Sequence, residues 1–110
     1  MIVHLVLFSP RPDLAETERE DVRNTLQRAL NEIPSVRSYK VGQRVRLGTA
    51  YDRAAAIDFE FFVTIEVDDE RSLSDYLAHP PHQKLGQLFY ETSGHALASD
   101  FRLVDISSLR

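Results

Sequence analysis

Hydrophobic residues fill the first strand-length segment of the chain, 2–8, and a single polar residue, His4, interrupts them. Because successive side chains of a strand point to opposite faces, both faces of this segment are apolar. Such a strand lies in the middle of a sheet, with helices over one face and another apolar surface over the other. The proline-rich segment 9–13 ends it. One face holds Ile2, His4, Val6 and Phe8, and the other holds Val3, Leu5 and Leu7.

A helical pattern follows over residues 14–33. Apolar residues recur at the spacing of an amphipathic helix, and acidic residues crowd its first half, where they favour the positive end of the helix dipole. We interpret these acidic residues as a solvated helix face rather than a metal site. Pro34 ends the helix. The apolar stripe consists of Val22, Leu26, Ala29, Leu30 and Ile33.

Two further strands are predicted next. Residues 36–47 mix apolar side chains with four cations, which indicates either an anion-binding ribbon or, as the preferred interpretation, an edge strand protected from aggregation by its charge. Residues 48–52 are expected to form a turn or short loop. Residues 54–67 are rich in aromatic and β-branched residues and predict a long third strand. The four cations are Arg37, Lys40, Arg44 and Arg46.

The last third of the chain predicts two helices and a strand. The acidic segment 68–70 caps a short helix over 72–78. A second proline cannot sit inside that helix, but Pro81 suits the first turn of a further helix, which is expected to run to Gly94. Residues 96–106 predict the final strand.

The element order β-α-β-β-α-β is the ferredoxin-like plan, an α+β fold. Its four-stranded sheet carries helices on one face, so the apolar second face needs a partner. We therefore expect a single domain over residues 1–110 and a homodimer whose two sheets close into an α/β barrel.

Composition narrows the classes of function. The 110 residues carry 13 basic and 17 acidic side chains, and the net charge of −4 disfavours binding to nucleic acid. The chain has no cysteine, which excludes a disulfide framework, a thiol nucleophile and cysteine-based metal sites. No segment resembles a signal peptide or approaches the about 20 apolar residues of a membrane helix. A cytoplasmic protein without a membrane partner is expected.

The segment Tyr76–His82 holds most of the candidate chemistry, because it carries one phenol and two imidazoles with two prolines that fix the backbone. In acid–base catalysis a histidine can remove a carbon-bound proton while a tyrosine stabilises the developing enolate. The alternative is a kinked helix whose rings fill the gap at the break, and the spacing favours neither. The prolines between His79 and His82 disfavour a metal-ligand pair.

His4 is a polar residue in an apolar strand and needs a hydrogen-bond partner there. Taken alone, this position favours a structural histidine over a functional one. The helix break nevertheless turns the residues after Pro80 toward the middle of the sheet. We therefore expect His4, Tyr76 and His82 to converge on one cavity.

Several short motifs occur along the chain in the order of a known family. Over essentially its whole length the chain resembles the stress-responsive A/B barrel domain (Dabb) family, and the tyrosine-histidine motif is the most specific of the matches. The resemblance implies a ferredoxin-like domain that dimerises into an α/β barrel. The motifs are Met1-Ile2-Val3-His4 with Phe8, Tyr51-Asp52 before Phe59, Tyr76-x-x-His79-Pro80-x-His82, and Asp100-Phe101.

The resemblance implies two possible functions. Many relatives carry the motif without a known reaction, which implies a small dimeric stress-responsive domain that binds a small apolar molecule in its cavity. In olivetolic acid cyclase-like members, the corresponding residues serve an aldol condensation of a linear polyketide. This implies a cyclase or isomerase that acts beside a carbonyl, with His4, Tyr76 and His82 as catalytic residues and His79 as a structural one. Neither function calls for a cofactor or a metal.

Overall fold

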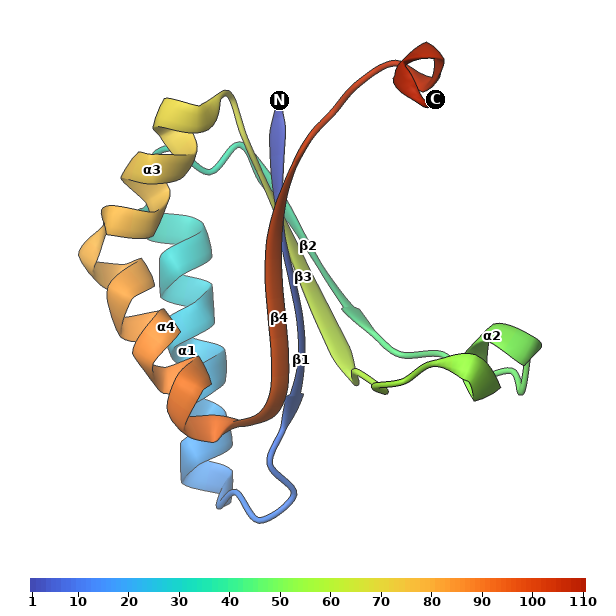
Figure 1. Ribbon diagram of the computed structural model, residues 1–110. Helices are drawn as coiled ribbons and strands as arrows, with labels where there is room; N and C mark the ends of the chain where they lie inside the picture. The colour runs from blue at the N-terminus through green and yellow to red at the C-terminus, as the bar shows by residue number, and fades with distance from the viewer.

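The computed structural model describes all residues, 1–110, and arranges them as a four-stranded sheet with its long helices on one side (Figure 1). This is the ferredoxin-like α+β fold that the element order predicts. The strands are β1 (Ile2–Pro10), β2 (Ser38–Gln43), β3 (Phe61–Val67) and β4 (Ser93–Arg102). The helices are α1 (Glu16–Glu32), α2 (Ala50–Ala54), α3 (Glu70–Ala78) and α4 (Pro80–Thr92), followed by a short 3-10 helix, η1 (Ile106–Ser108).

The strand β1 lies inside the sheet, as its two apolar faces predict. The strand order is β2-β3-β1-β4, and every neighbouring pair is antiparallel. Val6, for example, lies between Val63 of β3 and Ala98 of β4. The helices α1, α3 and α4 form a layer over one face of this sheet (Figure 1).

The hydrophobic core lies between the helical layer and the sheet. Along β3, buried residues alternate with half-buried ones, so that one side of the strand packs under the helices. No helix of the chain has the length and apolar character that crossing a membrane requires. The core residues are Ile2, Phe8, Ala29, Leu30, Ile33, Val63, Ile65, Val67, Tyr76 and Leu85.

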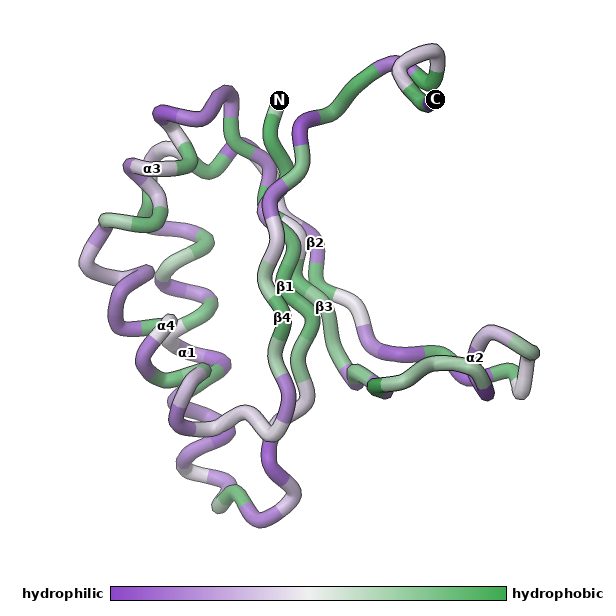
Figure 2. The backbone as a smooth tube through the Cα atoms, in the orientation of Figure 1, coloured by the Kyte–Doolittle hydropathy of each residue, from purple (hydrophilic) through white to green (hydrophobic).

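The opposite side of the sheet is apolar and uncovered within one chain, and we call it the open face. Figure 2 shows that the central strands are hydrophobic along most of their length. Leu97 and Phe101 of β4 are 50% and 53% exposed on this face. Its apolar residues are Val3, Leu5, Leu7, Phe62, Leu97 and Phe101.

The prediction of a strand over residues 54–67 is wrong for its first half. β2 ends at Gln43 and β3 begins at Phe61, and the residues between them, 44–60, form a projection that we call the arm. The arm contains α2, so the expected loop over 48–52 is partly helical. The helix begins there because the Thr49 hydroxyl accepts a hydrogen bond from the amide of Asp52, at 3.2 Å, and the Asp52 carboxylate caps the amide of Thr49 in return.

Ion pairs hold the base of the arm together. Arg44 lies 3.2 Å from Asp52 and 3.5 Å from Asp58, and Arg46 lies 3.0 Å from Asp58 and 2.9 Å from Glu60. Of these residues, all but Asp52 lie in segments that the sequence pattern assigns to strands.

The last strand begins and ends earlier than the sequence predicts. α4 ends at Thr92, and β4 starts at the next residue and pairs along β1 until Arg102 reaches the end of that strand. Residues 103–110, which we call the tail, then leave the sheet. The arm and the tail both extend to the side of the sheet opposite the helices (Figure 1).

Candidate functional site

His4 lies on the helix-facing side of β1, as the alternation of this strand predicts. The residue is 6% exposed, and in the sheet it lies between Ile65 of β3 and Asp100 of β4. Its Nδ1 atom is 2.6 Å from the Oδ1 atom of Asp100. The carboxylate therefore satisfies one nitrogen of a buried imidazole that has lost its hydrogen bonds to water.

The break between α3 and α4 positions the second histidine of the site. His79 precedes a proline and has an extended backbone, with φ −67° and ψ 137°. Its carbonyl oxygen accepts hydrogen bonds from the amides of His82 and Gln83, at 2.9 and 3.1 Å. Because prolines occupy the first two positions of α4, His82 is held in the first turn of that helix.

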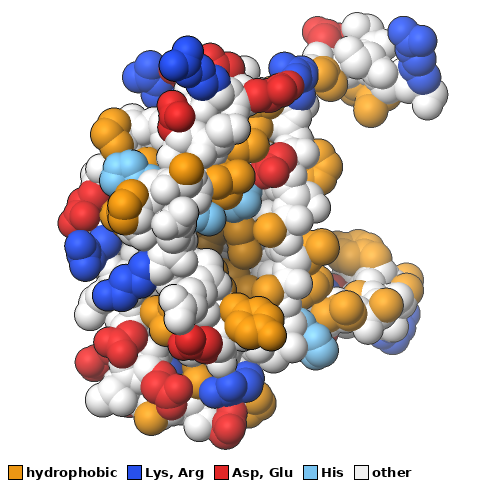
Figure 3. Space-filling model, turned by 60° about the vertical axis from the view of Figure 1, so that its left-hand side comes forward, with side chains coloured by type: hydrophobic (Ala, Val, Ile, Leu, Met, Phe, Trp, Pro, Cys, Tyr) orange, Lys and Arg blue, Asp and Glu red, His pale blue; other side chains and the backbone are white.

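The structure brings His4, Tyr76 and His82 together, and we call these three residues the His–Tyr cluster. The ring centroids of Tyr76 and His82 are 4.7 Å apart, and those of His4 lie 5.8 Å from Tyr76 and 6.1 Å from His82. Figure 3 shows histidine side chains at the bottom of a hollow between the helical layer and the sheet. The three rings come from β1, α3 and α4, so the cluster depends on tertiary folding.

The hydrogen bond of His82 determines which nitrogen of its ring carries the proton. Its Nδ1 atom lies 3.1 Å from the carbonyl oxygen of Leu77, which can only accept, so Nδ1 carries the proton. In the neutral ring this leaves the lone pair on Nε2. Burial lowers the pKa of His82, and the positive charge of a protonated His4 lowers it further, while the bond to Leu77 opposes both effects. A neutral imidazole with an available Nε2 is suited to act as a base.

Tyr76 is suited to donate a hydrogen bond. The residue is 1% exposed, and burial raises the pKa of its phenol above the ordinary value, so the hydroxyl stays protonated at neutral pH. No group of the chain accepts a hydrogen bond from this hydroxyl. The phenol is therefore available to an oxygen atom of a bound molecule.

Two other polar residues, Asp100 and His79, belong to the region around the His–Tyr cluster. Asp100 belongs to the site because its carboxylate contacts His4. The sequence motif includes Asp100 but predicts no role for it. Alternation along the last strand puts Asp100 and Phe101 on opposite faces, but only the pairing of β4 with β1, which sets Asp100 opposite His4, shows that Asp100 shares the face of His4. His79, interpreted as structural, makes no ring contact with the His–Tyr cluster, and its Nδ1 atom is buried without a hydrogen-bond partner.

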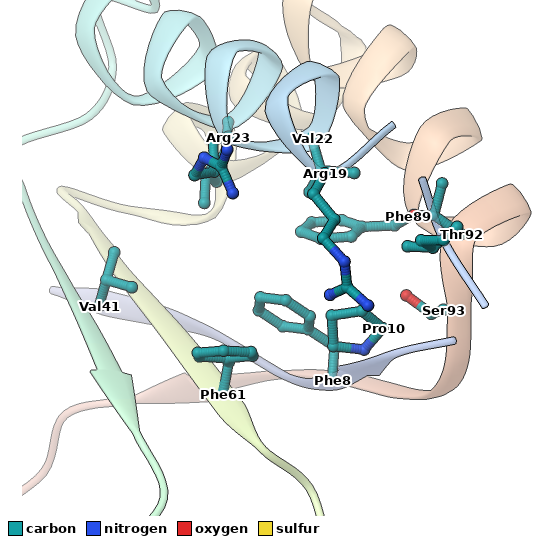
Figure 4. Close-up of a pocket in the computed structure, with 12 residues that line it drawn as sticks. Phe8, Pro10, Arg19, Val22, Arg23, Val41, Phe61, Phe89, Thr92 and Ser93 are labelled. Atoms are coloured by element: carbon teal, nitrogen blue, oxygen red, sulfur yellow. The ribbon is translucent and has the colours of Figure 1, made fainter. Parts of the chain in front are cut away.

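A second feature of the same layer is an apolar cavity between α1, α4 and the sheet, with a volume of about 270 Å³. Phenylalanine rings form its floor (Figure 4), and the ring of Phe8 lies 5.5 Å from that of Phe61 and 4.8 Å from that of Phe89. Phe8 and His4 share one face of β1, so the cavity and the cluster are about 13 Å apart along the strand. The cavity also has two arginines of α1 in its wall, Arg19 and Arg23.

The four cations around β2 do not form an anion-binding ribbon. Three of them pair with carboxylates of the chain, and β2 lies at the edge of the sheet, as the preferred interpretation expects. No group of three or more histidine, aspartate or glutamate side chains is placed to hold a metal ion. The pairs are Arg37 with Asp68, Arg44 with Asp52 and Asp58, and Arg46 with Asp58 and Glu60.

Comparison with known proteins identifies a family model that covers most of the chain. The model, described as Stress responsive A/B Barrel Domain, matches residues 2–103. No curated protein matches the chain in sequence. Among solved structures, a Dabb family protein with a ferredoxin-like fold from Mesorhizobium loti has 18% sequence identity and a TM-score of 0.73, over 94% of this chain and 97% of that chain.

Two other solved structures share the fold. A dimeric ferredoxin-like protein of unknown function from Thermobifida fusca has 24% identity and a TM-score of 0.71, over 93% of this chain and 90% of that chain. The hydroxynitrile lyase from Passiflora edulis has 12% identity and a TM-score of 0.77, over 94% of each chain. At these identities the likeness establishes the fold alone.

Proposed function

The chain belongs to the stress responsive A/B barrel domain family, and from this premise we propose that it acts as a homodimer that binds a small apolar molecule between its helices and its sheet. The observation that carries the binding proposal is the apolar cavity of about 270 Å³. Ligand pockets are mostly apolar concavities with a few placed polar groups. This cavity has that character, and the polar groups of the His–Tyr cluster lie in the same layer.

The open face supports the dimer. An exposed apolar surface of this extent is unusual for a monomer and indicates an interaction site. The Thermobifida fusca protein of the same fold is dimeric, and a second copy presents the same apolar surface. Packing of two open faces would bury the residues that one chain leaves exposed.

The arm and the tail extend the same surface. Both lie on the side of the open face, and both expose large apolar side chains. In a dimer they would reach past the sheet and contact the partner, which removes these side chains from water. The exposed apolar residues are Val45, Leu47, Tyr51 and Ile57 in the arm, and Leu103, Val104, Ile106 and Leu109 in the tail.

Ligand binding is tested by titrating the protein with N-phenyl-1-naphthylamine, an uncharged probe that fluoresces in apolar surroundings. We expect saturable fluorescence with the wild type and its loss in Val22→Trp, which fills the cavity from α1. The matched control is Gln27→Trp on the exposed side of the same helix. Wild-type fluorescence that stays at the buffer level, or unchanged binding in Val22→Trp, contradicts the proposal.

A second candidate function is proton transfer beside a carbonyl group, and the convergence of His4, Tyr76 and His82 favours it. In this proposal Nε2 of His82 removes a proton from the carbon next to the carbonyl. The electron pair of the broken C–H bond moves to the carbonyl oxygen, and the resulting enolate accepts a hydrogen bond from the Tyr76 hydroxyl. This is the half-reaction that a cyclase and an isomerase have in common.

In this second candidate, His4 and Asp100 support the reacting groups. The carboxylate of Asp100 holds the ring of His4 through Nδ1. Positive charge on His4 lowers the pKa of His82 and so favours its neutral form, because two neighbouring positive charges repel each other. His82 and Tyr76 are therefore proposed as the catalytic residues in contact with substrate. His4 is proposed to act indirectly, through its effect on the pKa of His82.

Proton transfer is tested by following deuterium incorporation next to the carbonyl of 2-octanone in heavy water by NMR. We expect the wild type to accelerate the exchange and His82→Gln to abolish the acceleration. His79→Gln is the matched control, because His79 belongs to the same motif but lies outside the cluster. Exchange at the rate of buffer alone, or equal rates in His82→Gln and the wild type, contradicts this function without bearing on ligand binding.

A further inference from the structure

All charged residues in the wall of the apolar cavity are positive, and all of them come from α1. Arg19 and Arg23 of α1 are among its lining residues, and no acidic residue is. This is notable in a chain with 17 acidic and 13 basic residues. Figure 4 shows the Arg19 side chain extending from α1 toward the sheet, in the direction of Phe8 and Pro10.

The two arginines differ in their partners. The Nη2 atom of Arg23 donates a hydrogen bond to the Glu16 carboxylate, at 2.7 Å, so its charge is compensated within α1. Arg19 pairs with no carboxylate of the chain. The one hydrogen bond of its side chain runs from Nη2 to the carbonyl oxygen of Arg11 and is long, at 3.5 Å. A half-buried guanidinium in this situation has most of its donors free for an anion.

A second polar group in the cavity wall lacks a partner. The Ser93 hydroxyl is buried and makes no hydrogen bond within the chain. Ser93 lines the same cavity, and Figure 4 shows its oxygen directed to the side on which the Arg19 guanidinium lies. A buried hydroxyl without a partner is costly, so its position indicates a hydrogen bond to something that enters the cavity.

We propose that the cavity binds an apolar monocarboxylic acid, with its carboxylate on Arg19 and Ser93 and its apolar part among the phenylalanine rings. This inference rests on the proposed ligand binding and names its chemical class. A guanidinium matches a carboxylate with two parallel hydrogen bonds, and one uncompensated cation matches one negative charge. The volume of about 270 Å³ lies near the lower end of ligand pockets, which favours a short acid.

The test compares octanoate with octanamide, which has the same size and no charge, by isothermal titration calorimetry. The wild type is expected to bind octanoate at least about tenfold more tightly, since a hydrogen bond to a charged group is worth about 1.5–3 kcal/mol. Arg19→Gln should remove this preference and leave octanamide binding unchanged, which also shows that the variant is folded. Ser93→Ala should weaken octanoate binding by about threefold to tenfold.

Arg23→Gln is the matched control, because Arg23 lines the same cavity but is already paired, and it should keep the preference. Arg19→Lys retains the charge and should keep part of the preference. Equal affinity of the wild type for both compounds, or a preference that survives in Arg19→Gln, overturns the carboxylate assignment while ligand binding stands. Binding of neither compound at millimolar concentration overturns this inference, and the N-phenyl-1-naphthylamine titration then decides separately whether the cavity binds apolar molecules.

Discussion

The Nδ1 atom of His82 lies 3.1 Å from the carbonyl oxygen of Leu77, five residues earlier in the chain. The bond crosses the break between α3 and α4 and fixes both the orientation of the imidazole and the position of its proton. It leaves the lone pair of the neutral ring on Nε2. The local sequence around the two prolines thus determines which nitrogen of His82 carries the proton, as well as the position of the ring.

We predict that His82 titrates below the ordinary histidine pKa of about 6.5. Burial is the main cause, and the groups that face the ring are His4, Tyr76 and, through His4, Asp100. Because unfolded His82 takes up a proton that the folded ring resists, the stability of the protein should fall as the pH drops below about 6.5. NMR titration of the imidazole C–H signals measures the pKa directly.

His82→Gln serves as the control for this titration. It removes the proton uptake, so its stability should fall less than that of the wild type over the same pH range. A measured pKa at or above that of free histidine would show that burial does not determine the pKa of His82.

Asp100→Asn should destabilise the protein by about 1–3 kcal/mol, because it weakens the only hydrogen bond to a buried imidazole. Chemical denaturation measures the change. Asp75→Asn is the control, since Asp75 is exposed on α3 and forms no ion pair. Equal effects of the two substitutions would mean that the contact between Asp100 and His4 contributes nothing to stability.

Tyr76→Phe should change the free energy of unfolding by less than about 0.5 kcal/mol, because the deleted hydroxyl makes no hydrogen bond within the chain. Tyr76→Ala removes a ring from the core and should cost about 3–5 kcal/mol. Thermal and chemical unfolding of the two variants give the comparison. A large loss in Tyr76→Phe would assign the phenol a structural partner and weaken its proposed role as a donor to substrate.

Leu5→Glu should dissociate the proposed homodimer, since Leu5 lies on the central strand of the open face. In sedimentation the wild type is expected at twice the chain mass of 12.6 kDa. The variant should appear as a monomer of reduced stability, because folding and association share this surface. Gln27→Glu adds a charge to the helical side and should leave the mass unchanged. A wild type that sediments as a folded monomer is the outcome that would refute the dimer.

Gly42→Ala should destabilise the sheet, and Gly86→Ala should not. A Cβ atom at Gly42 would lie 1.9 Å from the ring of Phe62, which would have to leave its place on the open face. Gly86 lies inside α4 with open space around it, and alanine there should stabilise the protein by about 0.5–1 kcal/mol. Comparison of the two unfolding curves tests the packing of Phe62.

The parts of the fold that the sequence predicts are those fixed by local patterns. The two faces of β1 follow from alternation, and the ends of α1 and α3 lie within two residues of the predicted ends. Two prolines determine the break that places His82. The place of His4 on β1 and this break together predict the convergence of the His–Tyr cluster, but the apolar cavity lies further along β1 and is lined by none of the three residues.

The structure of the arm was not predicted from the sequence, for two different reasons. Residues 54–60 have apolar positions that fit a strand, and whether they pair depends on β2, which ends at Gln43. By contrast, Thr49 and Asp52 have the spacing of a capping box, so the helix that follows them was readable in the sequence. The role of Asp100 depends on the register between two strands that lie at opposite ends of the chain, and no local pattern contains that information.

The contact between His4 and Asp100 spans 96 positions of the sequence, and this has a consequence for synthesis on the ribosome. β1 is made before both of its neighbours in the sheet, β3 and β4, which come much later in the chain. The two edges of this apolar strand therefore stay unpaired until β3 and then β4 have left the ribosomal tunnel. An unpaired apolar strand is prone to aggregation during this time, and His4 gains its partner Asp100 only when β4 emerges.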